Sequence, residues 1–147
     1  MPPPNYRYYF PLQVRYADTD AQGHVFFGNY FTFLDEASGG YFRAIGFPWS
    51  RMQELGLDIY YVNAQCNYSG SATYEDMLHI YVRMARIGNT SFTIEGVIYK
   101  AGEDQPIASG QITSVVVNPQ TRQPVPVPDE LRRAVAAFEG ETPPPET

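Results

Sequence analysis

The chain has few of the residues that mark secreted, metal-binding or nucleic-acid-binding proteins. It contains one cysteine and two histidines among 147 residues, so an intramolecular disulfide is excluded and a site of clustered nitrogen and sulfur ligands is disfavoured. Ten Lys and Arg side chains stand against sixteen Asp and Glu, and no basic stripe is available to neutralise phosphates. We therefore expect neither nucleic acid nor a membrane surface as a partner.

Long apolar runs are also missing. No stretch approaches the roughly 20 residues that span a bilayer, and the first ten residues, "MPPPNYRYYF", lack the charged start and apolar centre of a secretory signal. Together with the single cysteine, these absences predict a cytoplasmic protein.

Aromatic residues are abundant instead. Twelve Tyr and nine Phe favour strands and half-buried surfaces, so the composition indicates a sheet-rich fold. The length predicts one domain, 1–147. Proline-rich segments at both ends, "MPPPN" and "GETPPPET", are expected to form extended tails, which leaves a folded part of about residues 6–139.

The spacing of apolar residues predicts an α+β fold. From Asn29 to Ile45 they recur every three or four positions, which indicates one long helix. From Asp76 to Arg86 apolar and polar residues alternate, as in a strand with one buried face. A long helix packed on an antiparallel sheet is α+β. The other expected elements are strands at Tyr8–Tyr16, Ile59–Ser69, Ser91–Lys100 and Ile107–Val117, a short helical piece at about Trp49–Leu55, and a helix at Asp129–Phe138.

The segment "ADTDAQGHVFFGNY", residues 17–30, concentrates polar side chains between the first strand and the long helix. Its spacing matches the first positions of a calcium loop, but position 12 is Asn29, where a bidentate Glu is needed. Asp18, Asp20 and His24 offer ligands for a transition metal, yet the other histidine and the only cysteine stand far away in the sequence. We expect no metal and no cofactor.

Two interpretations of this segment remain open from the residues alone. Asp, Thr and Gly suit a turn, and a carboxylate near a helix N-terminus is stabilised by the helix dipole. Alternatively, a carboxylate beside the unpaired amides of a helix start can catalyse thioester hydrolysis, because a thiolate leaves with little acid assistance. An Asp then acts either as general base on water or as a nucleophile that forms an anhydride.

The longer stretch "VRYADTDAQGHVFFGNYFTFLDEAS", residues 14–38, resembles the hot-dog-fold acyl-CoA thioesterases of the 4-hydroxybenzoyl-CoA thioesterase family. The likeness continues through "GFPW" at 46–49, "AQCNYSGSATYEDMLHI" at 64–80 and "TSFTIEGVIY" at 90–99. It implies a five-stranded antiparallel sheet wrapped around one long central helix, and hydrolysis of acyl-CoA. It also implies a homodimer or homotetramer with active sites at the subunit interface.

The resemblance assigns catalytic roles to three residues. The family's catalytic carboxylate matches Asp20, and the amide that polarises the thioester carbonyl matches the backbone N–H of Phe27. His24 matches a histidine found in many members, which either orients substrate or water or packs within the loop. Asp18 is expected to hold the turn.

Four further residues are candidates for binding acyl-CoA. Asn29 and Tyr30 open the long helix at the catalytic turn. Asp35, about two turns further on, is either a solvated residue or an acceptor for a hydroxyl group of the acyl moiety. Arg86 is a candidate for contact with the nucleotide half of CoA.

One departure from the family concerns the helix. Many relatives carry an arginine after the "E-A-S" segment, whereas this chain has Gly39 followed by Gly40, which predicts a roomier acyl pocket. Each glycine inside a helix costs up to ~1 kcal/mol relative to Ala, which is tolerable where the backbone must pack closely.

Two alternative functions stay open on the same fold. The acyl group is carried either by CoA or by an acyl carrier protein, and a basic groove would favour the acidic carrier protein. A module that binds acyl-CoA without hydrolysing it would be marked by loss of the catalytic carboxylate, whereas Asp20 is present.

Overall fold

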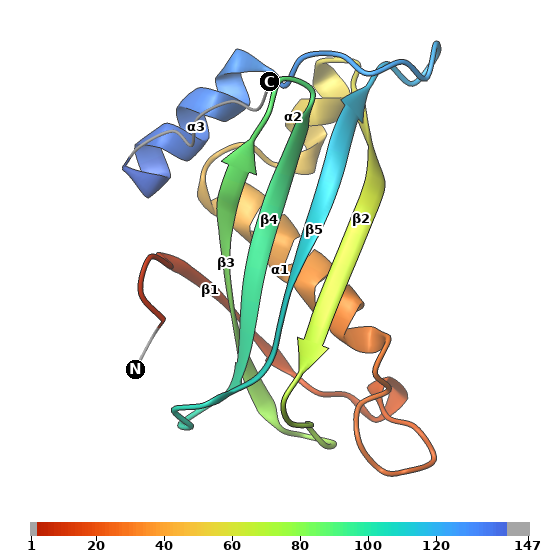
Figure 1. The fold of residues 1–147 in the computed structure, drawn as a ribbon, viewed down its shortest axis with the longest axis vertical. Helices are drawn as coiled ribbons and strands as arrows, with labels where there is room; N and C mark the ends of the chain where they lie inside the picture. The colour runs from red at the N-terminus through yellow and green to blue at the C-terminus, as the bar shows by residue number, and fades with distance from the viewer. Residues whose placement is uncertain (1–2, 141–147) are drawn as a thin grey trace.

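The computed structural model describes residues 3–140 of the chain. Its strands form one antiparallel sheet in the order β1-β3-β4-β5-β2, and the long helix α1 lies across one face of that sheet (Figure 1). The elements are β1 (Tyr8–Gln13), the 3-10 helix η1 (Tyr16–Asp18), α1 (Asn29–Ala44), α2 (Trp49–Glu54), β2 (Asp58–Tyr68), β3 (Met77–Ile87), β4 (Ser91–Lys100), β5 (Pro106–Val117) and α3 (Asp129–Glu139).

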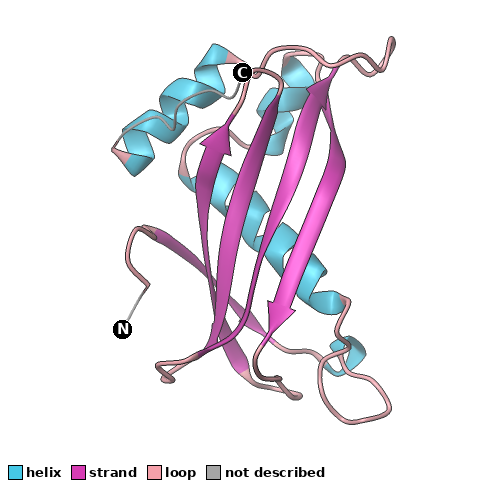
Figure 2. Cartoon of the chain, in the orientation of Figure 1, coloured by secondary structure: helices cyan, strands magenta, loops and turns pink. Residues whose placement is uncertain are grey.

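This arrangement confirms the α+β hot-dog fold expected from the sequence. The expected elements occur in the expected order, most with bounds within one or two residues of the predicted ones. Figure 2 shows that the connection before α1 and the connection after β5 lie at opposite ends of the sheet. The single-domain assignment stays a prediction, and most of the proposed C-terminal tail lies outside the described residues.

The first strand is shorter than predicted. We expected it to reach Tyr16, but β1 ends at Gln13 and the chain turns into η1. The cause is local, because the backbone and side chain of Arg15 donate hydrogen bonds to the Asp18 carboxylate. Such side-chain contacts compete with continuation of a sheet ladder.

The core lies between α1 and the concave side of the sheet. On β3 the residues Leu78, Ile80, Val82 and Met84 are buried in alternation, as the sequence pattern predicted. Residues of α1 meet them from the other side at helical spacing. The buried residues of α1 are Tyr30, Phe33, Leu34, Ala37, Ser38, Gly40 and Tyr41.

Glycines let α1 approach the sheet closely. A Cβ on Gly40 would collide with the Tyr8 hydroxyl and would stand 2.8 Å from a ring carbon of Phe10. The Leu34 side chain fits against Gly96 of β4 and Gly110 of β5, where a Cβ would overlap it. The close packing expected for the helix glycines is therefore confirmed at Gly40.

The C-terminal helix α3 closes one end of this core. The Tyr41 hydroxyl donates to the Glu139 carboxylate at 2.7 Å, and Arg51 of α2 pairs with Glu130 at 2.8 Å. These contacts tie α3 to both other helices. No helix within residues 3–140 is long and apolar enough to cross a membrane.

Candidate active site

The polar segment before α1 folds around the buried side chain of Asp18. This carboxylate is only 3% exposed as a residue and accepts hydrogen bonds from the Arg15 backbone and guanidinium. Burial raises the pKa of Asp18, but the Arg15 hydrogen bonds and charge outweigh that effect and hold the pKa below its usual value. The expectation that Asp18 holds the turn is confirmed.

Asp20 sits at the start of a small hairpin that ends at His24. Its backbone N–H donates to the His24 carbonyl at 3.0 Å, and its carbonyl accepts from Gly23 at 3.0 Å. Gly23 has a φ of 87°, a conformation that glycine adopts without steric cost. One carboxylate oxygen, Oδ1, accepts from the Gln22 amide at 2.9 Å. The other, Oδ2, accepts no hydrogen bond from residues 3–140 and is available to a substrate or water.

The start of α1 leaves two backbone amides unused. The Phe26 amide and the Asn29 side-chain amide both donate to the Asp18 carbonyl, at 3.0 and 2.9 Å. The Asn29 backbone amide turns back to the Phe26 carbonyl at 2.9 Å. Within the described part of the chain, the amides of Phe27 and Gly28 find no acceptor. These donors are free to bind an oxygen atom of a ligand.

Tyr68 of β2 holds the peptide unit between Phe27 and Gly28. Its hydroxyl donates to the Phe27 carbonyl at 2.7 Å, and its ring packs edge-on against Phe27 and Tyr30. Partial burial raises the pKa of this hydroxyl to about 12, so it keeps its proton at neutral pH. Sequence reasoning missed Tyr68, because β2 places it beside the helix start only in the folded chain.

His24 and Tyr30 both contact the loop between β2 and β3. The backbone of His24 pairs with Thr73, and its ring Nδ1 lies 3.4 Å from the Val25 carbonyl. Tyr30 is buried, and its hydroxyl accepts a hydrogen bond from the Ala72 amide at 3.2 Å. The roles proposed for these side chains stay predictions.

Asp35 lies further along α1 on an exposed part of the helix. It accepts a hydrogen bond from the Tyr61 hydroxyl of β2 at 2.9 Å. Partial burial and this hydrogen bond raise the pKa of Tyr61 to about 12. One interpretation of the sequence was that Asp35 accepts a hydrogen bond from a substrate hydroxyl. In the folded chain it accepts one from the Tyr61 hydroxyl.

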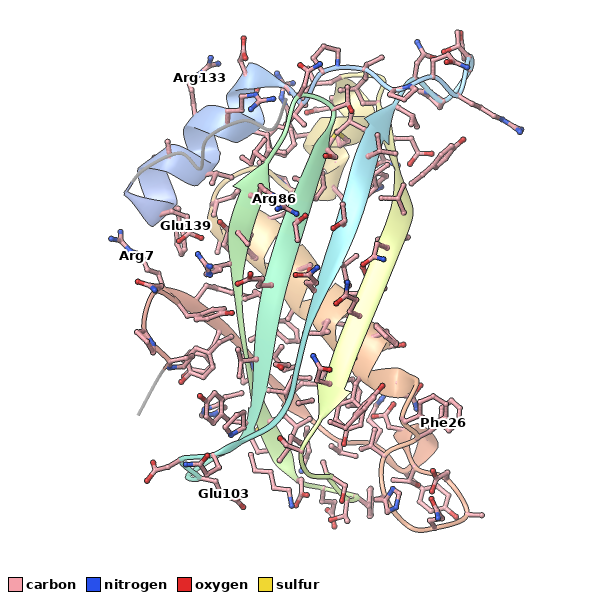
Figure 3. All side chains as sticks on the ribbon, viewed as in Figure 1. Arg7, Phe26, Arg86, Glu103, Arg133 and Glu139 are labelled. Atoms are coloured by element: carbon pink, nitrogen blue, oxygen red, sulfur yellow. The ribbon has the colours of Figure 1, made fainter. Side chains whose placement is uncertain are left out.

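The structure does not bring Arg86 to the catalytic turn of its own chain. Figure 3 shows Arg86 on β3, in the half of the molecule remote from Phe26. Arg86 therefore cannot contact a CoA nucleotide bound next to Asp20 of the same chain. Its predicted role in nucleotide binding otherwise stays a prediction. Across residues 3–140, no three side chains of His, Cys, Asp or Glu gather as metal ligands would.

Comparison with known proteins places this geometry in a family. The sequence model of the thioesterase-like superfamily matches residues 14–135. The chain belongs to that superfamily. The match covers the catalytic turn, all of α1 and the four strands that follow it.

Individual relatives agree with this membership. A putative esterase of Aquifex aeolicus is 32% identical over 105 residues, 71% of this chain and 80% of its own. The long-chain acyl-CoA thioesterase FadM of Escherichia coli is 28% identical over 122 residues, 82% of this chain and 91% of its own. The structure of a gentisyl-coenzyme A thioesterase superposes with a TM-score of 0.76 at 29% identity, covering 88% of this chain and 99% of that one.

The thioesterase-like superfamily accounts for the fold and the class of reaction. The protein is a thioester hydrolase, as the resemblance in the sequence implied. Membership of the 4-hydroxybenzoyl-CoA thioesterase family in particular stays a prediction.

Proposed function

We propose that the protein hydrolyses acyl-CoA thioesters to the free acid and CoA, with Asp20 as the reactive carboxylate. One observation carries this proposal above the others. Among residues 3–140, an Asp20 oxygen without a hydrogen-bond partner and the unused amide of Phe27 belong to the same short segment, which leads into α1. A carboxylate and an unpaired donor are the two groups that thioester hydrolysis needs.

The chemistry assigns a separate task to each group. As general base, Asp20 takes a proton from water while the water oxygen attacks the thioester carbon; as nucleophile, it attacks that carbon and forms an anhydride that water then opens. In both routes the Phe27 amide donates to the carbonyl oxygen as negative charge develops on it. The carbon–sulfur bond breaks with its electron pair on sulfur, and CoA leaves as the thiolate.

Asn29 and Tyr68 support the Phe27 amide without touching the reacting atoms. Asn29 binds the Asp18 carbonyl, and Tyr68 binds the Phe27 carbonyl. The Phe26 carbonyl, which shares a peptide unit with the Phe27 amide, accepts from the Asn29 backbone amide, and Tyr68 holds the next peptide unit. Preorganised donors of this kind lower the barrier because they need no reorganisation during the reaction.

The relatives with named substrates favour CoA as the carrier of the acyl group. FadM acts on long-chain acyl-CoA and the superposed structure is that of a gentisyl-CoA thioesterase, so the two differ in the acyl group and agree on CoA. The net charge of −6 would repel an acidic carrier protein. Asp20 is present, and the non-hydrolytic alternative predicted its loss.

The proposed mechanism is tested by replacing Asp20→Asn and measuring thiol release from a panel of acyl-CoAs. We expect kcat to fall by at least about 100-fold, because the amide can neither accept a proton nor form an anhydride. Asp104→Asn, in the exposed hairpin between β4 and β5, is the matched control and should keep its turnover. Wild-type rates in Asp20→Asn would show that another group catalyses the reaction.

A further inference from the structure

An apolar groove runs along α1 beyond the catalytic turn, and the proposed mechanism makes no use of it. Its near section is bounded by Asp35 and Ser38 of α1 and by Tyr61 of β2. Its far section lies between the end of α1, α2 and the start of β2. Phe42, Ile59 and Phe92 line both sections, so the two sections adjoin each other along α1.

We propose that this groove holds the tail of a long, straight-chain acyl group, and that Gly39 sets how long that tail can be. The inference rests on the proposed function, because it assumes that the thioester lies at Asp20. Helix positions 35, 38, 39 and 42 share one face of α1. The groove therefore follows the same helix that begins two residues after Phe27.

The lining of the far section fits a flexible hydrocarbon. Phe47, Met52 and Phe92 supply apolar walls, and Met52 adapts its shape more readily than a branched residue would. The one charged residue at this section, Arg43, is exposed to solvent. No buried polar group is present on these walls to hydrogen-bond a hydroxylated ring.

Length separates a long acyl chain from a short or single-ring one. Gly39 is ten positions beyond Asn29, which places it about 15 Å along the helix at 1.5 Å per residue. An extended chain of single bonds advances about 1.2 Å per atom, so about twelve carbons are needed to reach the far section. A short acyl group ends before it.

Gly39 leaves the floor of the far section open. A Cβ placed on this residue would meet only the Arg43 guanidinium, at 3.4 Å, so there is room for a side chain that the sequence does not supply. The neighbouring Gly40 is different, because its Cβ position is already taken by Tyr8 and Phe10. Close packing explains Gly40, whereas the open space beside Gly39 is the room left for a ligand.

Trp49 provides a direct measure of occupancy. It is the only tryptophan in the chain, it lines the far section, and it is 46% exposed. Hexadecanoyl-CoA should shift its fluorescence to shorter wavelength as the tail displaces water. Butyryl-CoA carries the same CoA but should leave the emission unchanged. Because this measurement needs no turnover, it tests the groove separately from the catalytic role of Asp20.

The decisive variant is Gly39→Leu, which fills the far section. Each methylene excluded from an apolar site costs about fourfold in affinity. We therefore expect the ratio of kcat/KM for hexadecanoyl-CoA to that for butyryl-CoA to fall at least tenfold, with a matching loss of hexadecanoyl-CoA affinity in the fluorescence titration. Gly39→Ala makes the same backbone change with less bulk and should lower the ratio less than threefold. Ala44→Leu adds the same side chain at an exposed position of α1 and should leave the ratio unchanged.

The possible results separate the two proposals. If Gly39→Leu hydrolyses both substrates with an unchanged ratio of kcat/KM, the groove proposal is wrong and the thioesterase proposal stands. A wild-type preference for short or aromatic acyl-CoAs would have the same meaning. Absence of hydrolysis together with a Trp49 response to hexadecanoyl-CoA that Gly39→Leu weakens would support the groove and overturn the thioesterase proposal. If Gly39→Leu does not fold, Trp49→Ala tests the same wall, and unchanged long-chain preference in that variant would count against the groove.

Discussion

Two aspartates two positions apart differ in what their carboxylates contact. Asp18 is buried and saturated by Arg15, whereas Asp20 keeps one oxygen free of any partner in the described chain. A buried carboxylate that accepts both a backbone amide and a guanidinium is structural, because these hydrogen bonds fix the turn around it. A carboxylate with an open oxygen, in the same short segment as unpaired amides, has the groups that our proposal needs. The turn interpretation therefore fits Asp18, whereas the catalytic role of Asp20 stays a proposal.

At the same scale, Tyr68 is proposed as a positioning residue for the Phe27 amide. Tyr68→Phe removes only the hydroxyl that donates to the Phe27 carbonyl and keeps the ring contacts. Loss of one such hydrogen bond is worth about 1 kcal/mol, so we expect kcat to fall about fivefold while KM stays within twofold. Steady-state kinetics on one acyl-CoA measures both constants.

A matched control keeps the Tyr68 experiment specific. Tyr74 is 53% exposed, packs against Tyr16 and makes no hydroxyl hydrogen bond within residues 3–140. Tyr74→Phe should therefore retain wild-type kcat. Equal losses in both variants, or a Tyr68→Phe effect confined to KM, would count against the positioning role.

At the scale of the element, α1 contains adjacent glycines with opposite physical roles. Gly40 allows the helix to contact β1, and Gly39 faces open space. Only the first of these roles is a packing requirement. The conformational cost of Gly40 is offset by the close packing that it permits. In our proposal, Gly39 is present because it leaves room for the ligand.

These roles predict stability changes of opposite sign. Gly39→Ala should stabilise the protein by up to ~1 kcal/mol, because alanine restricts the unfolded chain and the site is unobstructed. Gly40→Ala should destabilise it by about 1–2 kcal/mol, because Tyr8 and Phe10 must move to admit the methyl group. Urea unfolding of the two variants measures both free energies. Destabilisation by both substitutions would show that the space beside Gly39 is not available.

At the scale of the whole molecule, β2 is an edge strand with a run of exposed apolar side chains in its first half. Tyr60, Tyr61 and Val62 are 40%, 60% and 59% exposed, and the sheet order leaves the outer side of β2 without a neighbouring strand. Long exposed apolar edges favour pairing with another chain. This surface supports the expected homodimer, in which β2 strands of two copies would meet.

A charge placed on this edge tests the proposed dimer. We expect Val62→Lys to shift the protein from dimer to monomer in sedimentation experiments, because a lysine on an edge strand opposes strand pairing. Gln120→Lys, in the exposed loop after β5, adds the same charge elsewhere and should remain dimeric. If the Val62→Lys protein still sediments as a dimer, the dimer interface does not include this part of β2.

The sequence determined the elements because their signals are local. The helical spacing from Asn29 to Ile45 and the alternation from Asp76 to Arg86 depend on neighbours only a few positions away, and both predictions were confirmed. The end of β1 was missed because the Arg15–Asp18 contact competes with the strand pattern. Asp20 and the Phe27 amide were named through the family resemblance of one short motif, and their roles stay predictions.

The tertiary structure decided which residues from distant segments act together. Tyr68 and Phe27 are 41 positions apart, and Asp35 and Tyr61 are 26 apart, and the folded sheet brings each pair together. It likewise separated Gly39 from Gly40, which look alike as neighbours in the sequence but face different surroundings. A local pattern records which face of an element is apolar. The partner that covers this face, and any space left beside it, depend on long-range packing that only the folded chain contains.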